Sequence, residues 1–180
     1  MDYKNKPTGL KHLTADNWLE PDKAARAFRE VNFATGEERE ASASRWAHLF
    51  LAVDLSPEVP DAIHDMWVIA RGVLLYAWFF YPLYALGDDQ LHRVADAAVL
   101  LRYQQAGGPE DTRSGQWPTL KKRLNWLIEQ GIIDKTVEKR WDAIRNLRNY
   151  GSHATYARIE MPIDALRTLE ILAREIDALY

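Results

Sequence analysis

Residues 141–153 read WDAIRNLRNYGSH, and this stretch decides how the rest of the chain is interpreted. At about 100° per residue, the large apolar residues here and just before this stretch fall on one face of a helix. That face is formed by Val137, Trp141, Ile144 and Leu147. Arg148 falls in the middle of the face, and a charged group directed into an apolar seam needs a partner or a chemical task. We therefore predict a bundle helix over residues 134–149 that delivers Arg148 to a functional position.

Helix signals continue along the whole chain, whereas strand signals are missing. Pro82 indicates a kink within a long helix, and Gly131 suits the position that follows a helix end. Asp88 and Asp89 can cap a helix that starts after them. We predict helices over residues 21–33, 37–53, 61–84, 88–105, 118–130, 134–149 and from 162 onward. The predicted fold class is all-α, a helical bundle, because no run alternates as a strand does.

The length of 180 residues favours one folded unit with a sizeable core. Within it, residues 1–58 are predicted to form an amino-terminal helical extension that packs on a bundle of residues 59–180. The chain has no cysteine, which excludes disulfides and thiolate metal sites and is typical of a reducing compartment. Residues 1–7 lack the apolar run of a signal peptide, so we expect a cytoplasmic protein.

One uncharged stretch has the composition of a membrane segment. Residues 72–87 form a run of 16 residues without charge, bracketed by Arg71 and Asp88 and interrupted by Pro82. A helix that spans a bilayer needs about 20 apolar residues. We therefore predict a buried helix in the middle of the bundle and no membrane association.

Charge is distributed unevenly along the chain. The net charge of −3 argues against a protein that coats nucleic acid generally. Residues 113–148 nevertheless carry nine Lys or Arg against four acids, while residues 51–108 carry three Arg against seven acids. A basic segment is often only a solvated helix face. Next to Arg148 and His153 it also favours a ligand that carries phosphate.

The residues of the 148–153 turn have complementary chemistry. Arg148 can hold a phosphate through two parallel hydrogen bonds, and His153 can transfer a proton near neutral pH. Asn149 can orient either group through its amide. Gly151 allows a backbone turn that brings His153 back toward Arg148. Together they can bind a phosphodiester and move protons beside it.

The motif resembles the signature of the HEPN superfamily, in which an arginine and a polar residue are followed, after three residues, by a histidine. Here these are Arg148, Asn149, residues 150–152 and His153. The approach over residues 141–149 is similar to the family helix that leads into the motif. The upstream segment, residues 124–133, resembles HEPN-type domains found beside bacterial defence and restriction genes. The resemblance covers roughly residues 60–180.

The resemblance implies a small all-helical domain that acts as a metal-independent endoribonuclease without a cofactor. It implies a homodimer whose two motifs face each other across a cleft, because one chain offers a single such histidine. RNA is the implied substrate, and an antitoxin or a partner from a defence system is an implied companion. The implied catalytic residues are Arg148, Asn149 and His153. The residues expected to bind substrate are Arg145, Tyr150 and Ser152. Some HEPN domains are not catalytic, so a module that binds nucleotide, RNA or a protein partner is the second hypothesis.

A purely structural role for the motif is also open. Arg148 can form an ion pair with an acid such as Asp142, Glu160 or Asp164, and His153 can cap a helix. In that case both side chains stabilise the bundle and do no chemistry.

A third hypothesis, from a different class, is a helical-bundle metal-binding protein. Asp61 and His64, and likewise Asp89 and His92, place a carboxylate and an imidazole three residues apart on a predicted helix. Helical bundles that hold two metal ions use such pairs, usually with glutamate and with further carboxylates from two other helices. Both pairs also lie near predicted helix starts, where aspartate caps are common. We therefore predict no metal ligands.

Overall fold

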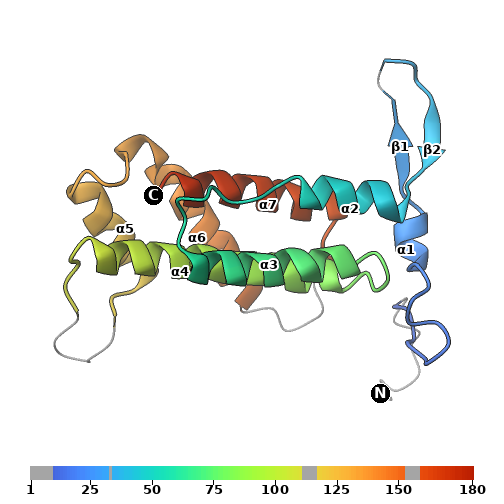
Figure 1. Cartoon of the computed structure of the whole chain (residues 1–180), viewed down its shortest axis with the longest axis horizontal. Coiled ribbons are helices and arrows are strands. Elements are labelled where there is room, and N and C mark those ends of the chain that lie inside the picture. The colour runs from blue at the N-terminus through green and yellow to red at the C-terminus, as the bar shows by residue number, and fades with distance from the viewer. Residues whose placement is uncertain (1–9, 33, 111–116, 153–158) are drawn as a thin grey trace.

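The computed structural model describes residues 10–32, 34–110, 117–152 and 159–180, and at residue 30 and residues 148–152 it describes the backbone alone. Most of the described chain is helical and the helices pack as a bundle, which confirms the all-α fold class (Figure 1). The helices are α1 (Lys23–Arg26), α2 (Ala43–Leu51), α3 (Asp61–Tyr76), α4 (Leu83–Gln105), α5 (Leu120–Glu129), α6 (Glu138–Ser152) and α7 (Pro162–Asp177).

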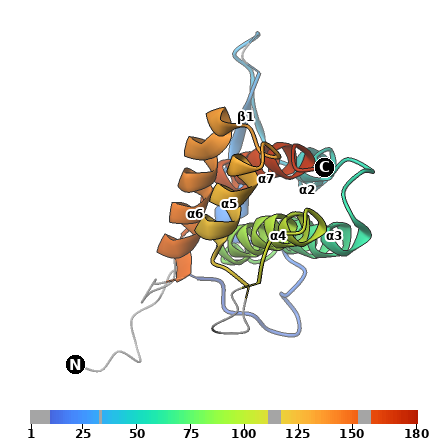
Figure 2. The ribbon, with the colours of Figure 1, turned by 90° about the vertical axis from the view of Figure 1, so that its left-hand side faces the viewer.

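Helix α4 is the centre of the bundle, because α3, α5, α6 and α7 all pack against it (Figures 1 and 2). Its buried residues include Leu91, Val94 and Val99. The neighbouring helices contribute large side chains to the same core, among them Trp67, Leu74, Leu127, Trp141, Leu169 and Leu172. Burial of each such side chain contributes about 1.5–3 kcal/mol, so these contacts hold the helices together.

The predicted long helix over residues 61–84 is wrong, because the uncharged run divides between two helices. Helix α3 ends at Tyr76, a turn follows, and α4 begins at Leu83 directly after Pro82. Proline lacks an N–H and clashes with a preceding helical turn, but it suits the start of a new helix. The two helices consequently lie side by side (Figure 1). No helix in the described part of the chain is both long and apolar enough to cross a membrane.

The early start of α4 also corrects the predicted helix over residues 88–105. Asp88 and Asp89 do not cap a helix start, since they lie in the second turn of α4. Asp88 is buried there, and its Oδ2 lies 3.7 Å from Nε2 of the buried His92. In the sequence, an aspartate that lies beside a buried histidine cannot be told from one that caps a helix.

The amino-terminal extension contains a β-hairpin that the sequence did not predict. Strands β1 (Arg29–Val31) and β2 (Glu38–Glu40) pair antiparallel, with Arg29 opposite Glu40, and the hairpin stands out from the bundle (Figure 1). The Asn32 side chain accepts a hydrogen bond from Ala34 N, and Gly36 has a φ of 71°. The hairpin replaces the end of the helix expected over residues 21–33 and the start of the helix expected over residues 37–53, so that α1 and α2 are shorter than expected.

Asp22 ties the extension to the bundle. Its buried carboxylate accepts hydrogen bonds from Ala24 N, which caps α1, and from Tyr81 N in the turn between α3 and α4. Its own N–H donates to Trp78 O at 2.9 Å. Farther along, the Phe28 ring stacks between the rings of Trp46 and Tyr81. Residues 22–50 therefore lie on the bundle through one buried charge and a set of aromatic contacts.

The predictions for the carboxy-terminal helices are confirmed in their main features. Gly131 has a φ of 69° just after α5, and Pro162 is the first residue of α7. Asp134 accepts a hydrogen bond from Thr136 N and caps a short 3₁₀ helix, Lys135–Val137, that runs directly into α6. The helix expected over residues 134–149 therefore exists, but it starts with a tighter turn and reaches Ser152.

Candidate functional site

Helix α6 leaves the core near the predicted motif. It packs on α4 and α5, and Figure 2 shows α5 and α6 next to each other on one side of the bundle. Trp141 is 2% exposed and Ile144 is 6% exposed, but Leu147, on the same apolar face, is 58% exposed. The bundle therefore covers this face as far as Ile144 and leaves it open immediately before Arg148.

The backbone of α6 carries most of the predicted motif. Arg148, Asn149, Tyr150 and Ser152 all lie within the helix, although their side chains are outside the described structure, and His153 lies outside the described residues. Helical spacing places Arg148 and Ser152 one turn apart on the same side of α6. The prediction of a turn at Gly151 is wrong, because residue 151 is still part of α6. Near a helix end the cost of glycine is small, about 1 kcal/mol or less.

Arg145 has a partner within its own helix. Its Nε donates to Asp142 Oδ1 at 3.3 Å, and its Nη2 lies 3.2 Å from the same oxygen. Arg145 is half-buried, so a bound phosphate would have to share it with Asp142. Asp164 likewise lies 3.6 Å from Arg167. Two of the three acids that we considered as partners of Arg148 thus have another arginine beside them.

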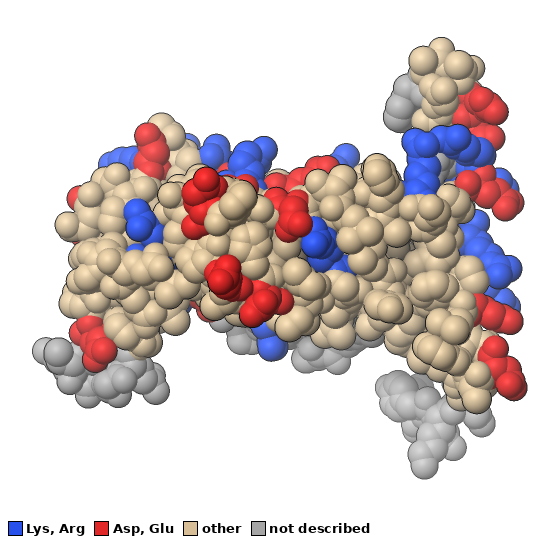
Figure 3. All heavy atoms as spheres, in the orientation of Figure 1, with Lys and Arg blue, Asp and Glu red and all other residues tan. Residues whose placement is uncertain are grey.

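The basic segment separates into exposed and structural residues. The exposed cations on α5, α6 and the turn between them are Lys121, Lys122, Lys135, Lys139 and Arg140. Arg123 is buried instead, and its Nη2 lies 2.6 Å from Asp96 Oδ1, which clamps α5 to α4. Acidic side chains gather over the start of α3 and the loop before it (Figure 3). The exposed cations of α5 and α6 therefore lie on or beside α6, with Glu129 and Asp134 among them.

The two acid–histidine pairs considered as metal ligands have other surroundings. A ring nitrogen of His64 lies 3.1 Å from Ser56 O, and Nε2 of His92 lies 3.7 Å from Asp88 Oδ2. Among the residues that the structure describes, no group of three or more histidine or acidic side chains is arranged to hold a metal ion.

Sequence reasoning missed a cavity of about 530 Å³ between the α5–α6 turn and the end of α7. Its wall includes Glu175, which is 1% exposed, together with Trp141 and Leu179. The signal was present in the sequence. Glu175 follows Leu172 by three residues and precedes Leu179 by four, which places an acid on the apolar face of α7.

Comparisons with curated proteins and with solved structures gave no match to this chain. One family model matches, and it covers the second half of α4 together with α5, α6 and α7. The match therefore includes the helix that carries Arg148. Residues 93–180 of this chain thus match the family described as a domain of unknown function, DUF4145.

Proposed function

We propose that this protein is a metal-independent endoribonuclease of HEPN type. The observation that carries the proposal is the Arg148-to-His153 motif at the carboxy-terminal end of α6, directly after the exposed Leu147. A motif that begins where a helix leaves the core is suited to reach a large substrate. The exposed lysines and arginine of α5 and α6 supply a surface for the RNA backbone.

In the proposed reaction the 2′-hydroxyl of the substrate is the nucleophile. A base removes its proton, the oxygen attacks the adjacent phosphorus, and an acid protonates the departing 5′-oxygen. His153 supplies proton transfer, because the unperturbed pKa of histidine, about 6.5, allows both protonation states near neutral pH. Arg148 holds the scissile phosphate and stabilises the charge that develops on it, while Asn149 orients the phosphate or the imidazole.

A second histidine is needed if one residue is the base and another the acid. We propose that it comes from a second copy of the chain, so that the two motifs face each other across a two-fold axis. The biological setting proposed with this activity is a toxin–antitoxin or defence system, in which a partner protein restrains the nuclease. Analytical ultracentrifugation at micromolar concentration tests the assembly. A monomer with full nuclease activity contradicts it.

The chemistry is tested with a short RNA of defined sequence, cleaved in EDTA. The expected products carry a 2′,3′-cyclic phosphate and a 5′-hydroxyl, because the nucleophile belongs to the RNA itself. A 2′-deoxy substitution at the cleaved position should block cutting there. Cleavage of DNA, or loss of activity on chelation, contradicts the proposal.

The residues are tested by substitution, with activity and thermal stability measured on the same preparations. His153→Ala and Arg148→Ala should each lower kcat by about 10²-fold or more. Arg148→Lys should restore little, because an ammonium lacks the paired donors of a guanidinium. The matched controls are His48→Ala on α2 and Arg167→Ala on α7, both exposed residues away from α6.

The controls should keep full activity, and all variants should melt close to the wild type. A wild type that binds RNA without cutting it overturns the nuclease and leaves the non-catalytic HEPN module. A wild type with neither property, whose Arg148→Ala variant melts much earlier, assigns the motif to the structure of the bundle.

A further inference from the structure

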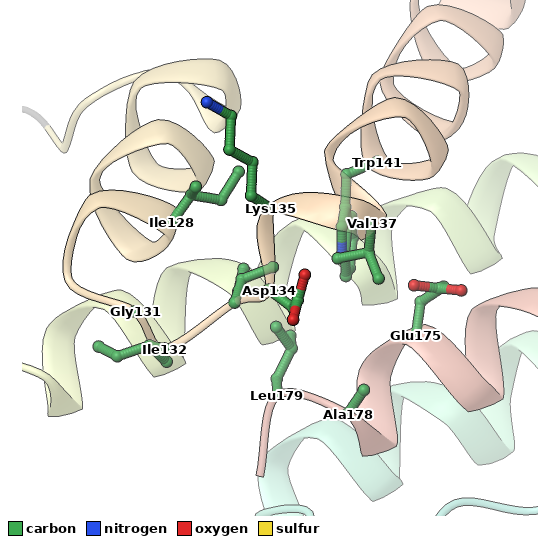
Figure 4. A pocket seen from close by; sticks show the side chains of 11 residues that line it. Ile128, Gly131, Ile132, Asp134, Lys135, Val137, Trp141, Glu175, Ala178 and Leu179 are labelled. Carbon is green, nitrogen blue, oxygen red and sulfur yellow. The ribbon is translucent and has the colours of Figure 1, made fainter.

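The cavity beside α7 combines an apolar wall with a buried carboxylate. Its volume of about 530 Å³ lies within the range of small-molecule sites. Ile133, Trp141 and Leu179 form a buried apolar floor, and Gly131 and Lys135 lie at the exposed rim. Figure 4 shows the Glu175 carboxylate at the side of this space, below Val137. A recess of this size, with an apolar floor and charged groups around it, can hold a small ligand that has both an apolar and a polar part.

The charge of Glu175 is compensated, but its hydrogen bonding is incomplete. Arg140 Nε lies 2.7 Å from Glu175 Oε1, and Arg174 Nε lies 3.6 Å from the same oxygen. Within the described structure no N–H points at Oε1 with the geometry of a hydrogen bond. A buried oxygen that lacks a directed donor is destabilising, so this carboxylate gains from any donor that enters the cavity.

The arginine at Glu175 can be replaced. The Arg140 side chain is 52% exposed, whereas that of Glu175 is 1% exposed. Arg140 does not line the cavity, so it approaches Glu175 from outside. A cation that enters the cavity can take over the compensation of Glu175 while Arg140 swings into water at little cost.

A second carboxylate at the cavity reinforces the preference for a cation. Asp134 lines the cavity, and its side chain is drawn toward the same space in Figure 4. The backbone N–H of Thr136, and after it the Thr136 hydroxyl, lower the pKa of Asp134, so this group is ionised at neutral pH. Trp141 adds an aromatic ring to the wall, which also favours a cation nearby.

We propose that this cavity binds a small organic cation, a primary amine attached to an apolar group. The ammonium donates to Glu175 and the apolar part rests on the floor formed by Ile133, Trp141 and Leu179. The site uses none of the 148–153 residues, so it stands independently of the proposed nuclease.

The test compares three probes that share a phenyl ring on a two-carbon chain and carry a cationic, a neutral or an anionic head group. They are 2-phenylethylamine, 2-phenylethanol and phenylacetate, each titrated into the full-length protein at neutral pH by calorimetry, with amide NMR shifts to locate the site. The amine should bind at least about tenfold tighter than the alcohol, since a charge-assisted hydrogen bond is worth 1.4 kcal/mol or more. Phenylacetate should not bind. The amide shifts should centre on Gly131 and Ala178.

Two substitutions must act in opposite directions. Glu175→Gln keeps the shape of the side chain and should weaken the amine about tenfold or more. Arg140→Gln removes the competing cation and should strengthen it. Glu170→Gln changes an exposed acid on the same helix and should have no effect. Preferential binding of phenylacetate, weaker amine binding in Arg140→Gln, or amine shifts elsewhere on the protein would each overturn the proposal. Absence of amine binding at about 10 mM would overturn it as well.

Discussion

Replacement of Gly87 by alanine tests the closest approach between two helices of the bundle. A Cβ at Gly87 would lie 2.5 Å from Cδ2 and 2.7 Å from Cγ of Leu74 on α3. Leu74 is fully buried, so its side chain has no free space to enter. Overpacking of this kind costs about 1–3 kcal/mol. The higher helix propensity of alanine offsets about 1 kcal/mol of this loss. The difference is a net loss of about 0–2 kcal/mol in the free energy of unfolding, and two contacts below 3.0 Å with a fully buried side chain place the expected loss in the upper half of that range.

The chain contains a matched control for this substitution. Gly72 lies within α3, and a Cβ there meets no atom within 4 Å. Gly72→Ala should therefore stabilise the protein by about 0.5–1 kcal/mol. Guanidinium denaturation measures both variants, and equal denaturant slopes show that the unfolding transition itself is unchanged. In thermal melts each kcal/mol corresponds to about 2–4 °C for a protein of this size.

A double substitution separates the clash from other effects. Leu74→Ala alone should cost about 2–5 kcal/mol through the cavity that it leaves. In the Gly87→Ala background the same change should cost at least about 0.5 kcal/mol less, because the new methyl group occupies part of that cavity. A Gly87→Ala protein as stable as the wild type would refute the reasoning. Strictly additive effects would show that Gly87 and Leu74 do not oppose each other.

Three further predictions concern the buried polar groups. Asp22→Ala should lower the free energy of unfolding by about 2–3 kcal/mol, because Ala24 N and Tyr81 N both lose their acceptor; Asp22→Asn should cost less in the same denaturation assay, and equal losses would contradict this role. Arg123→Ala should lower the free energy of unfolding by about 2–4 kcal/mol, since its Nη2 lies 2.6 Å from Asp96 Oδ1 beside the core. A loss below about 0.5 kcal/mol would show that the ion pair contributes no more than an exposed one does. Burial raises the pKa of Tyr84, Tyr103 and Tyr180. Unfolded tyrosine ionises near pH 10, while these folded phenols keep their protons. Their contribution to the free energy of unfolding is therefore fully present below about pH 10 and falls as the pH rises above it. A constant free energy of unfolding from about pH 8 to about pH 11, with phenolate absorbance as the reporter, would contradict the shifts.

The helices that could be predicted are those whose signals are local. Gly131 ends one helix and Pro162 starts another, and both act through the backbone of a single turn. Pro82 indicates a break in the helix, but the residue alone does not indicate whether the chain kinks or reverses. A kink and a complete reversal begin with the same residue, and the choice depends on whether α3 and α4 can bury their faces against each other.

The predictions failed where pairing between distant residues decides the structure. Arg29 pairs with Glu40 across a hairpin, and no periodicity in either short strand indicated it. Asn32 and Gly36 are the turn residues that make this pairing favourable. A strand of three residues has little preference of its own, so its state is decided by its neighbour across the turn.

The sequence alone determined the helical class of the protein and the spacing of Arg148, Asn149 and His153, because helix periodicity and residue spacing are properties of neighbouring residues. Only the tertiary structure decided that Leu147 is exposed while Ile144 is covered, and that Glu175 lies buried at a cavity. Both outcomes depend on where a helix meets its neighbours. Residues on one helix face have the same periodicity whether a partner helix covers them or stops short of them, so burial along that face is set by packing.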